Sequence, residues 1–138
     1  MKILLLEDDL ILNEIIEEHL LSQNYQVRAV YTGLEAQDLL YSQKFDLLLL
    51  DVNVPIFNGF ELLNELRQKE IYTPAIFLTS LNQVSDIEKG FNSGCDDYIK
   101  KPFELKELDI RINNIKRLFN INPNNLTEIS KDIFLDVE

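Results

Sequence analysis

Short apolar runs recur along the chain and predict five β-strands. The runs cover residues 3–6, 27–30, 47–50, 75–78 and 98–99. Several of them contain no polar residue, which is typical of strands that are covered on both faces. Between these runs, and after the last one, apolar residues recur at three- and four-residue spacing, which predicts amphipathic helices.

Five groups of apolar residues carry the helical spacing. They are Leu12, Ile15, Ile16 and Leu20; Ala36, Leu39 and Leu40; Leu62, Leu63 and Leu66; Val84, Ile87 and Phe91; and Leu105, Leu108, Ile112, Ile115 and Phe119. We expect Glu104 in the first turn of the last helix, where the helix dipole favours an anion. Strands that alternate with helices predict an α/β fold, a doubly wound parallel sheet with right-handed crossovers.

The helical pattern ends after Phe119, and the stretch "NINPNN" is rich in residues that favour turns. We therefore expect one domain over residues 1–120 and a linker over 121–126. In residues 127–138, apolar residues alternate on either side of Lys131 and Asp132, which predicts a hairpin. A hairpin of this size is not stable alone, so it either docks on the main domain or begins a further one.

Length, hydrophobic content and net charge limit the kinds of protein that this chain can be. The chain has 138 residues, of which 46% are hydrophobic, enough for one domain with its own core. Its apolar runs are shorter than the about 18 residues of a membrane span, and its single Cys95 cannot pair within the chain, so we expect a cytoplasmic protein without membrane contact. The net charge of −11 repels phosphate backbones and predicts no direct DNA binding by this part, although acidity also serves ordinary solubility.

Polar residues that could bind a ligand or take part in a reaction follow the predicted strands. Glu7 and Asp8 follow the first strand, Asp51 ends the third, Thr79 ends the fourth and Lys101 follows the fifth. Ligands of an open parallel sheet bind at the carboxyl ends of its strands. If the first and third strands are neighbours, three carboxylates converge, and each pair of charges about 4 Å apart costs roughly 4 kcal/mol at a dielectric of about 20. Such a cluster needs a cation, and oxygen ligands alone favour Mg²⁺.

A carboxylate beside Mg²⁺ can attack phosphorus and form an acyl phosphate. Asp51 is the candidate nucleophile, and Thr79 and Lys101 are a hydroxyl and a cation of the kinds that phosphoryl oxygens require. Each residue alone also has a plainer interpretation. Glu7 and Asp8 could cap a helix, Thr79 could bond its own backbone, and Lys101 could be a solvated surface charge, so the prediction depends on their joint position.

Four ordered motifs, "LLEDD", "LLLLDVNVPIFNG", "IFLTS" and "GCDDYIKKPF", resemble the receiver domain of two-component response regulators over about residues 1–120. The resemblance implies a CheY/flavodoxin-like (βα)5 fold with strand order 2-1-3-4-5. It implies that Asp51 accepts a phosphoryl group from a sensor histidine kinase. The domain would then be a signalling domain, not an enzyme on separate substrates, since it catalyses only its own phosphorylation and dephosphorylation.

The resemblance also assigns roles to single residues. It implies Mg²⁺ held by Glu7, Asp8, Asp51 and the backbone carbonyl of Asn53. It further implies that Thr79 is the switch hydroxyl, Tyr98 the aromatic that follows it inward, Lys101 the phosphate partner, and the bond before Pro102 a cis peptide bond. Asp9 would be a bystander at the start of the first helix.

The "DDYI.KPF" signature and the long last helix resemble the OmpR/PhoB subfamily in particular. There the hairpin after the linker opens a winged-helix DNA-binding domain, so residues 127–138 would begin a truncated effector of a transcriptional regulator, and DNA would be bound only through that missing part. A stand-alone receiver with a tail is the alternative. The subfamily forms homodimers through the fourth helix, fifth strand and fifth helix, a face that phosphorylation switches.

The match to that dimer face is partial. Asp97, Glu107 and Arg111 stand at matching positions, whereas Ile87, Asn92, Asn113 and Leu118 replace charged residues. Exposed ion pairs contribute about 0–1 kcal/mol each, so we expect a weak or phosphorylation-dependent dimer. Asp97 and Arg111 could instead form a solvated pair within one chain.

Two other function classes are open to the sequence. A degenerate receiver would serve as a constitutive dimerisation or protein-interaction module without phosphate, although such modules commonly lose one of the acidic or switch residues. A hydrolase of the haloacid dehalogenase kind would need a second aspartate where Asn53 stands. We expect His19 to be a surface or partly packed residue, and Cys95 to be a small packed one. Ile11 and Ile15 suit either helix packing or kinase docking.

Overall fold

The computed structural model describes residues 1–80 and 84–121, with side chains for all of these except 84–87. The predicted linker beyond Ile121, the predicted hairpin at 127–138 and the side chain of Ile87 lie outside the described residues. Within the described residues no helix combines the length and the apolar character that a membrane crossing requires.

Five parallel strands form one sheet in the order β2-β1-β3-β4-β5, which confirms the predicted fold class and strand order. The strands are β1 (Lys2–Leu6), β2 (Gln26–Val30), β3 (Leu47–Asp51), β4 (Ala75–Thr79) and β5 (Asp97–Lys100). In the register of β1 and β3, Leu6 pairs with Leu50. The residues that follow this pair, Glu7 and Asp51, therefore reach the carboxyl edge of the sheet side by side.

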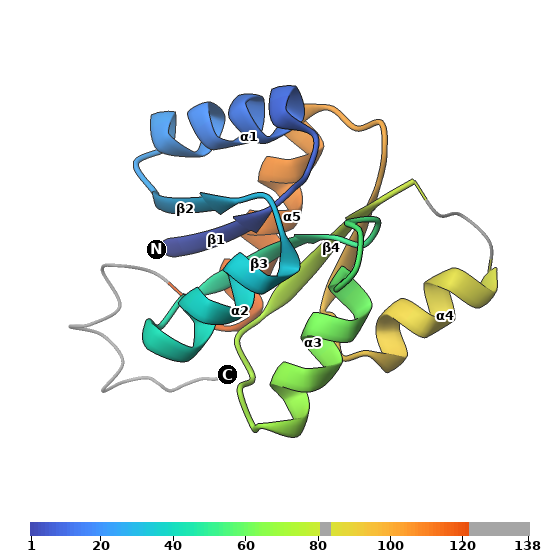
Figure 1. Cartoon of the computed structure of the whole chain (residues 1–138). Coiled ribbons are helices and arrows are strands. Elements are labelled where there is room, and N and C mark those ends of the chain that lie inside the picture. Colours follow the sequence, from blue (N-terminus) through green and yellow to red (C-terminus); the bar gives the residue numbers. More distant parts are fainter. Residues whose placement is uncertain (81–83, 122–138) are drawn as a thin grey trace.

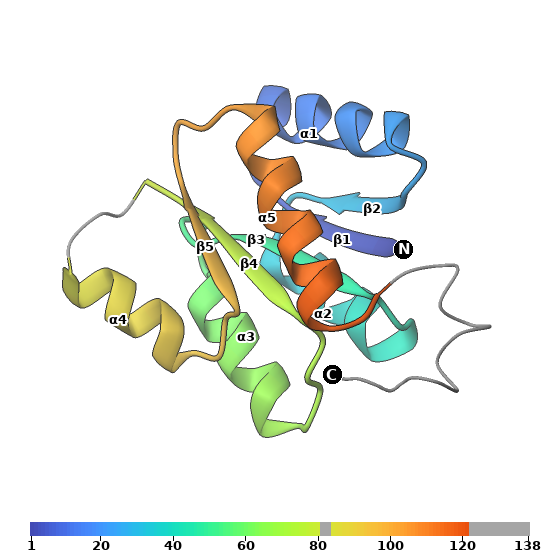
Figure 2. The same ribbon diagram turned by 180° about the vertical axis from the view of Figure 1, so that it is seen from behind.

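Five helices cover the two faces of the sheet. They are α1 (Leu10–Ser22), α2 (Gly33–Ser42), α3 (Gly59–Gln68), α4 (Val84–Asn92) and α5 (Leu105–Leu118). Helices α1 and α5 lie on one face, and α2, α3 and α4 lie on the other (Figures 1 and 2). The strands therefore lie in the middle of three layers, as the unbroken apolar runs predict.

Alternate residues of the central strands enter two separate cores. Leu48 and Leu50 pack with α2 and α3, whereas Leu47 and Leu49 pack with α1 and α5. All four side chains are fully buried. Since burying one leucine contributes roughly 1.5–3 kcal/mol, this strand stabilises the packing on both faces of the sheet. It also fixes the position of its last residue, Asp51, at the carboxyl edge of the sheet.

Side-chain caps fix where several helices begin. Thr32 and Asn58 each form a capping box with the glutamate three residues later, at the starts of α2 and α3. Glu104, predicted in the first turn of α5, is instead the residue before the helix, and its side chain makes no capping hydrogen bond. The acidic residue in that first turn is Glu107, so the prediction for Glu104 is wrong by one position.

Candidate functional site

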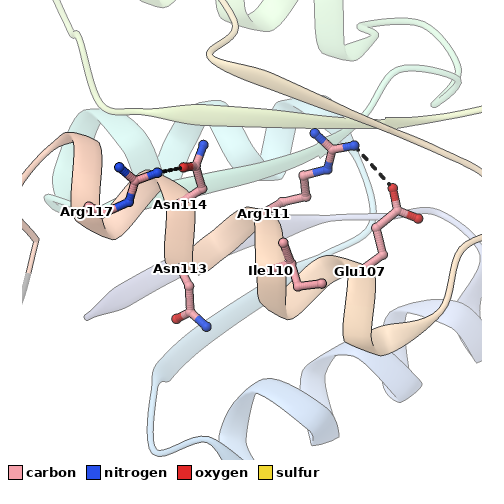
Figure 3. A pocket seen from close by; sticks show the side chains of 6 residues that line it. All are labelled: Glu107, Ile110, Arg111, Asn113, Asn114 and Arg117. Atoms are coloured by element: carbon pink, nitrogen blue, oxygen red, sulfur yellow. Dashed lines mark hydrogen bonds and ion pairs between the residues drawn. The ribbon is translucent and has the colours of Figure 1, made fainter.

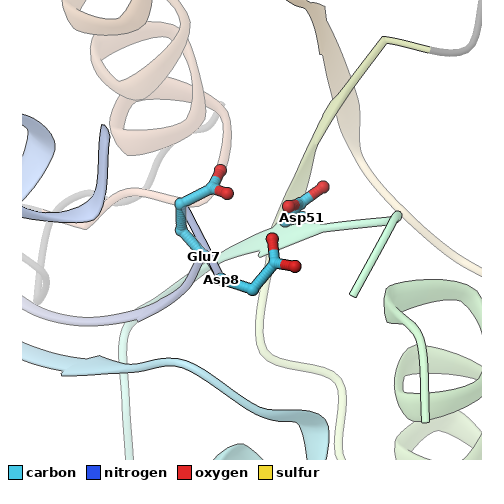
Figure 4. Close-up of side chains that lie close together, drawn as sticks. All are labelled: Glu7, Asp8 and Asp51. Carbon is cyan, nitrogen blue, oxygen red and sulfur yellow. The ribbon is translucent and has the colours of Figure 1, made fainter. Parts of the chain in front are cut away.

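Three carboxylates meet at the carboxyl edge of β1 and β3. Glu7, Asp8 and Asp51 each place an oxygen atom within 4.8 Å of the others (Figure 4). Glu7 is fully buried and Asp51 is 1% exposed, whereas Asp8 lies at the surface. The cluster is thus open on one side, and its donors are all carboxylate oxygens, a donor set that suits Mg²⁺.

Lys101 brings a positive charge to the two buried carboxylates. Its Nζ lies 2.6 Å from Oε1 of Glu7 and 3.3 Å from Oδ2 of Asp51. The backbone N–H of Lys101 donates to the carbonyl of Thr79 at 2.7 Å, which ties the loop after β5 to the end of β4. One ammonium group against three carboxylates leaves the cluster with an excess of negative charge when all three are ionised.

The titration of these groups reflects that excess. Burial raises the pKa of Glu7 to about 7, with the neighbouring Asp51 adding to the effect and Lys101 opposing it. Burial and Asp51 also raise the pKa of Asp8 above its usual value. Burial lowers the pKa of Lys101, but its contacts with Glu7 and Asp51 outweigh burial and raise the pKa overall. The site therefore favours added protons or added cations.

The loop after β3 holds the carboxylate of Asp51 in place. Its Oδ1 accepts a hydrogen bond from the backbone N–H of Asn53 at 3.0 Å. The side-chain amide of Asn53 donates to Oγ of Ser80 at 3.0 Å, which links this loop to the one after β4. Helix α3 begins against the same backbone, because a Cβ on Gly59 would lie 2.8 Å from the Asp51 carbonyl oxygen. The side chain of Asp51 is therefore held by the backbone of Asn53, and its main chain is held by the start of α3.

The other expected site residues lie around this cluster. Thr79 is fully buried at the end of β4, next to the strand that Asp51 ends. Tyr98 is partly buried and packs against the core shared with α2 and α3. The Lys101–Pro102 peptide bond is cis. Glu7, Asp8, Asp51 and Lys101 are thus brought into one group.

The expected dimer residues pair within the chain. Nη1 of Arg111 lies 3.2 Å from Oδ1 of Asp97. Its Nη2 lies 3.5 Å from Oε2 of Glu107, the ion pair that Figure 3 draws. These side chains are partly exposed on α5 and β5. Leu118 is 62% exposed, and Asn113 lines an open hollow beside Ile110.

Two residues beside the site make contacts that were not predicted from the sequence. Asp9, expected to be a bystander, is the N-cap of α1 and accepts hydrogen bonds from the backbone N–H groups of Ile11 and Leu12. Asn13, to which no role was given, is a fully buried polar residue on the inner face of α1. Its position in step with Ile16 and Leu20 was the signal that could have indicated burial.

Two residues outside the site match their expected character. His19 is partly packed, and its Nε2 lies 2.7 Å from Oδ1 of Asp109, which joins α1 to α5. Cys95 is buried in the core, and burial raises the pKa of its thiol to about 12. A buried thiol with a raised pKa carries little of the reactive thiolate at neutral pH, which fits a packed side chain.

Comparisons with known proteins agree with this geometry. The family described as "Response regulator receiver domain" matches residues 3–113. The transcriptional regulatory protein CrdR of Helicobacter pylori is 44% identical over 134 residues, which are 96% of this chain and 60% of that protein. The transcriptional regulatory protein CiaR of Streptococcus pneumoniae is 42% identical over 127 residues, which are 91% of this chain and 56% of that protein. The chain therefore spans less than two thirds of the length of these relatives.

A solved structure shows the same arrangement of elements. The receiver domain of a Francisella response regulator superposes with a TM-score of 0.81 at 31% identity, covering 86% of this chain and 98% of that one. With the family match over most of its length, the chain belongs to the response regulator receiver domain family.

Proposed function

We propose that this receiver takes a phosphoryl group from a sensor histidine kinase onto Asp51. An oxygen of the Asp51 carboxylate attacks phosphorus, the phosphorus–nitrogen bond of a phosphohistidine breaks, and the released imidazole nitrogen takes up a proton. The product is an acyl phosphate on Asp51, which water later hydrolyses. The observation that carries this proposal is the enclosed Asp51 carboxylate, held between two further carboxylates and the ammonium group of Lys101.

The residues present fit a Mg²⁺ ion. Glu7, Asp8 and Asp51 would supply side-chain oxygens and Asn53 its backbone carbonyl, a set of hard oxygen donors that leaves room for water. Mg²⁺, when bound, neutralises negative charge on the transferring phosphoryl group.

Two other residues would stabilise the phosphoryl group. Lys101 already lies 3.3 Å from the Asp51 carboxylate and can turn its ammonium group to a phosphoryl oxygen. Thr79 ends the neighbouring strand, and its hydroxyl can donate to another oxygen. Tyr98 would move inward when Thr79 does, and the face formed by α4, β5 and α5 would change with it, a population shift that the phosphorylated form favours.

The kinase has an apolar surface available beside the site. Ile11 and Ile15 on α1 are 73% and 45% exposed, so a large part of each side chain is open to a partner. Leu12, Pro102 and Phe103 line an apolar hollow that also contains Lys101. A partner helix resting on this surface would bring its phosphohistidine to the open side of the carboxylate cluster.

The proposal extends to the arrangement of the whole protein. Residues 1–120 are the receiver, 121–126 a linker and 127–138 the start of a winged-helix DNA-binding domain of the OmpR/PhoB type, in a cytoplasmic transcription regulator. The names of the relatives and the share of their length that this chain spans support this arrangement.

A homodimer through α4, β5 and α5 is part of the same proposal, and it would be weak or dependent on phosphorylation. Arg111 already pairs with Asp97 and Glu107 inside the chain. An intermolecular ion pair at this face would have to replace those contacts, so its net gain is small.

Intact mass measurement tests the central step. The chain is incubated with acetyl phosphate and Mg²⁺, beside an Asp51→Asn variant and an Asp38→Asn control at an exposed position on α2. We expect the mass of one phosphoryl group on the wild type and on the control, and none on Asp51→Asn. If the wild type gains no mass although it binds Mg²⁺, the phosphoacceptor role is wrong, and an interaction module that works without phosphate becomes the better account.

A further inference from the structure

Asn13 is a buried polar residue next to the carboxylate cluster, and the proposed reaction leaves it without a role. Its side chain is fully enclosed on the inner face of α1, where Ile16 and Leu20 also lie. The amide Nδ2 donates to the main-chain oxygen of Glu7 at 2.9 Å and to that of Val30 at 3.1 Å. Its Oδ1 has no hydrogen-bond partner among the described residues.

These contacts indicate that the N–H2 group of Asn13, and not its side-chain oxygen, is the part that matters for the structure. A buried oxygen without a partner carries a desolvation cost, which an apolar residue at the same position would not incur. Both N–H bonds, in contrast, are used, and both go to main-chain carbonyls at the ends of β1 and β2. Since the backbone N–H of Glu7 also donates to the Val30 carbonyl, the Asn13 amide continues the pairing of these two strands past the end of β1.

The turn that Asn13 holds carries two of the proposed metal ligands. On its far side, the backbone N–H of Asp9 donates to Oε2 of Glu7 at 3.1 Å, and the backbone N–H of Asn13 donates to the Asp9 carbonyl at 2.8 Å. The main chain from Glu7 to Asp9 is therefore fixed at both ends, with Asp8 between them. Groups that orient metal ligands in this way typically change metal affinity when they are removed.

We propose that Asn13 is a positioning residue for the metal site: its amide holds the turn after β1 so that the carboxylates of Glu7 and Asp8 face Asp51. This inference rests on the proposed function, because it concerns the Mg²⁺ that the phosphoryl transfer uses. It assigns Asn13 no contact with the metal or with the phosphoryl group.

Mg²⁺ titration by calorimetry on the whole chain tests the proposal. Asn13→Ala removes the side-chain donor to the carbonyls of Glu7 and Val30, of which the Val30 carbonyl keeps the backbone N–H of Glu7. We expect this variant to bind Mg²⁺ about 10-fold more weakly than the wild type. Leu20→Ala on the same helix is the control, because it creates a cavity in the core without touching the turn. We expect it to lower the melting temperature and leave the Mg²⁺ affinity within about twofold of the wild type.

Two further measurements separate positioning from loss of structure. Asn13→Ser keeps one donor, so we expect its affinity to lie between those of the wild type and Asn13→Ala, and circular dichroism checks that each variant is folded.

The possible failures are distinct. Equal Mg²⁺ affinity of the wild type and the folded Asn13 variants overturns the positioning role alone, as does an equal loss in Leu20→Ala. A wild-type chain that binds no Mg²⁺ overturns the metal site of the proposed function, and the role of Asn13 with it.

Discussion

The Mg²⁺ affinity of the chain is expected to depend on pH, because Glu7 titrates near neutrality. Burial and the adjacent Asp51 raise the pKa of Glu7 from its ordinary value of 4.5 to about 7 in the metal-free chain. Below that pH the carboxyl carries a proton, which Mg²⁺ must displace. For one group with this pKa, the affinity at pH 6 is about 10-fold weaker than at pH 8, and above pH 8 it changes little.

The same group makes the stability of the metal-free chain depend on pH. Because the folded-state pKa of Glu7 lies above the unfolded value of 4.5, its contribution to stability is fully present below pH 4.5 and is lost as the pH rises through 7. At 1.36 kcal/mol for each pH unit between the two pKa values, the full loss is about 3 kcal/mol. The raised pKa of Asp8 acts in the same direction. Mg²⁺ should remove most of this loss.

Calorimetry in two buffers with different ionisation enthalpies measures both the affinity and the protons released. One equivalent of Mg²⁺ should release about 0.9 protons at pH 6 and about 0.1 at pH 8. In Glu7→Gln this group cannot titrate, so the variant should bind more weakly but with a flatter pH profile. An affinity that is the same at pH 6 and pH 8, or no proton release at pH 6, would refute the titration assigned to Glu7.

Three further substitutions test the local structure. Ile56 has φ = 71° and is 94% exposed. Ile56→Gly should therefore relieve backbone strain without loss of packing and raise the free energy of unfolding, measured in urea, by about 1 kcal/mol. A decrease in that free energy would contradict this. Gly94 has φ = 97°, and a Cβ there would lie 2.9 Å from Cγ of Arg67, so Gly94→Ala should lower that free energy by about 1–2 kcal/mol, measured in the same way. Lys101→Met leaves two buried carboxylates without their cation and should cost about 3 kcal/mol without metal. In thermal scans, Mg²⁺ should then stabilise Lys101→Met more than the wild type, and equal stabilisation would count against the charge argument.

The sheet was predictable because its central strands carry an unambiguous pattern. Strands buried on both faces read as unbroken apolar runs, and β3 ends where the apolar run gives way to Asp51. Periodicity did not give the order of the strands, which came from the resemblance. Edge strand β2 is an example, because its alternating burial indicates which face is buried and does not indicate which strand lies beside it.

The parts of the site that sequence reasoning missed depend on contacts between distant residues. The proposed role of Asn13 requires its amide to meet the carbonyl of Val30, 17 residues along the chain. The positive φ of Ile56 could not be predicted from the sequence, because a β-branched residue is not expected in that conformation. Arg111 could pair within the chain or with a partner, and sequence spacing alone does not decide between those contacts.

The charge balance of the cluster links metal binding to phosphorylation in the proposed reaction. Three carboxylates and one ammonium group leave about two negative charges when Glu7 is ionised, and a phosphoryl group on Asp51 adds more. Each uncompensated pair of charges about 4 Å apart costs roughly 4 kcal/mol at a dielectric of about 20, so the acyl phosphate is strongly disfavoured without a divalent cation. Coupling between two ligands is reciprocal. If Mg²⁺ favours the phosphorylated state for this reason, the phosphorylated chain must hold Mg²⁺ more tightly than the unmodified chain by the same factor.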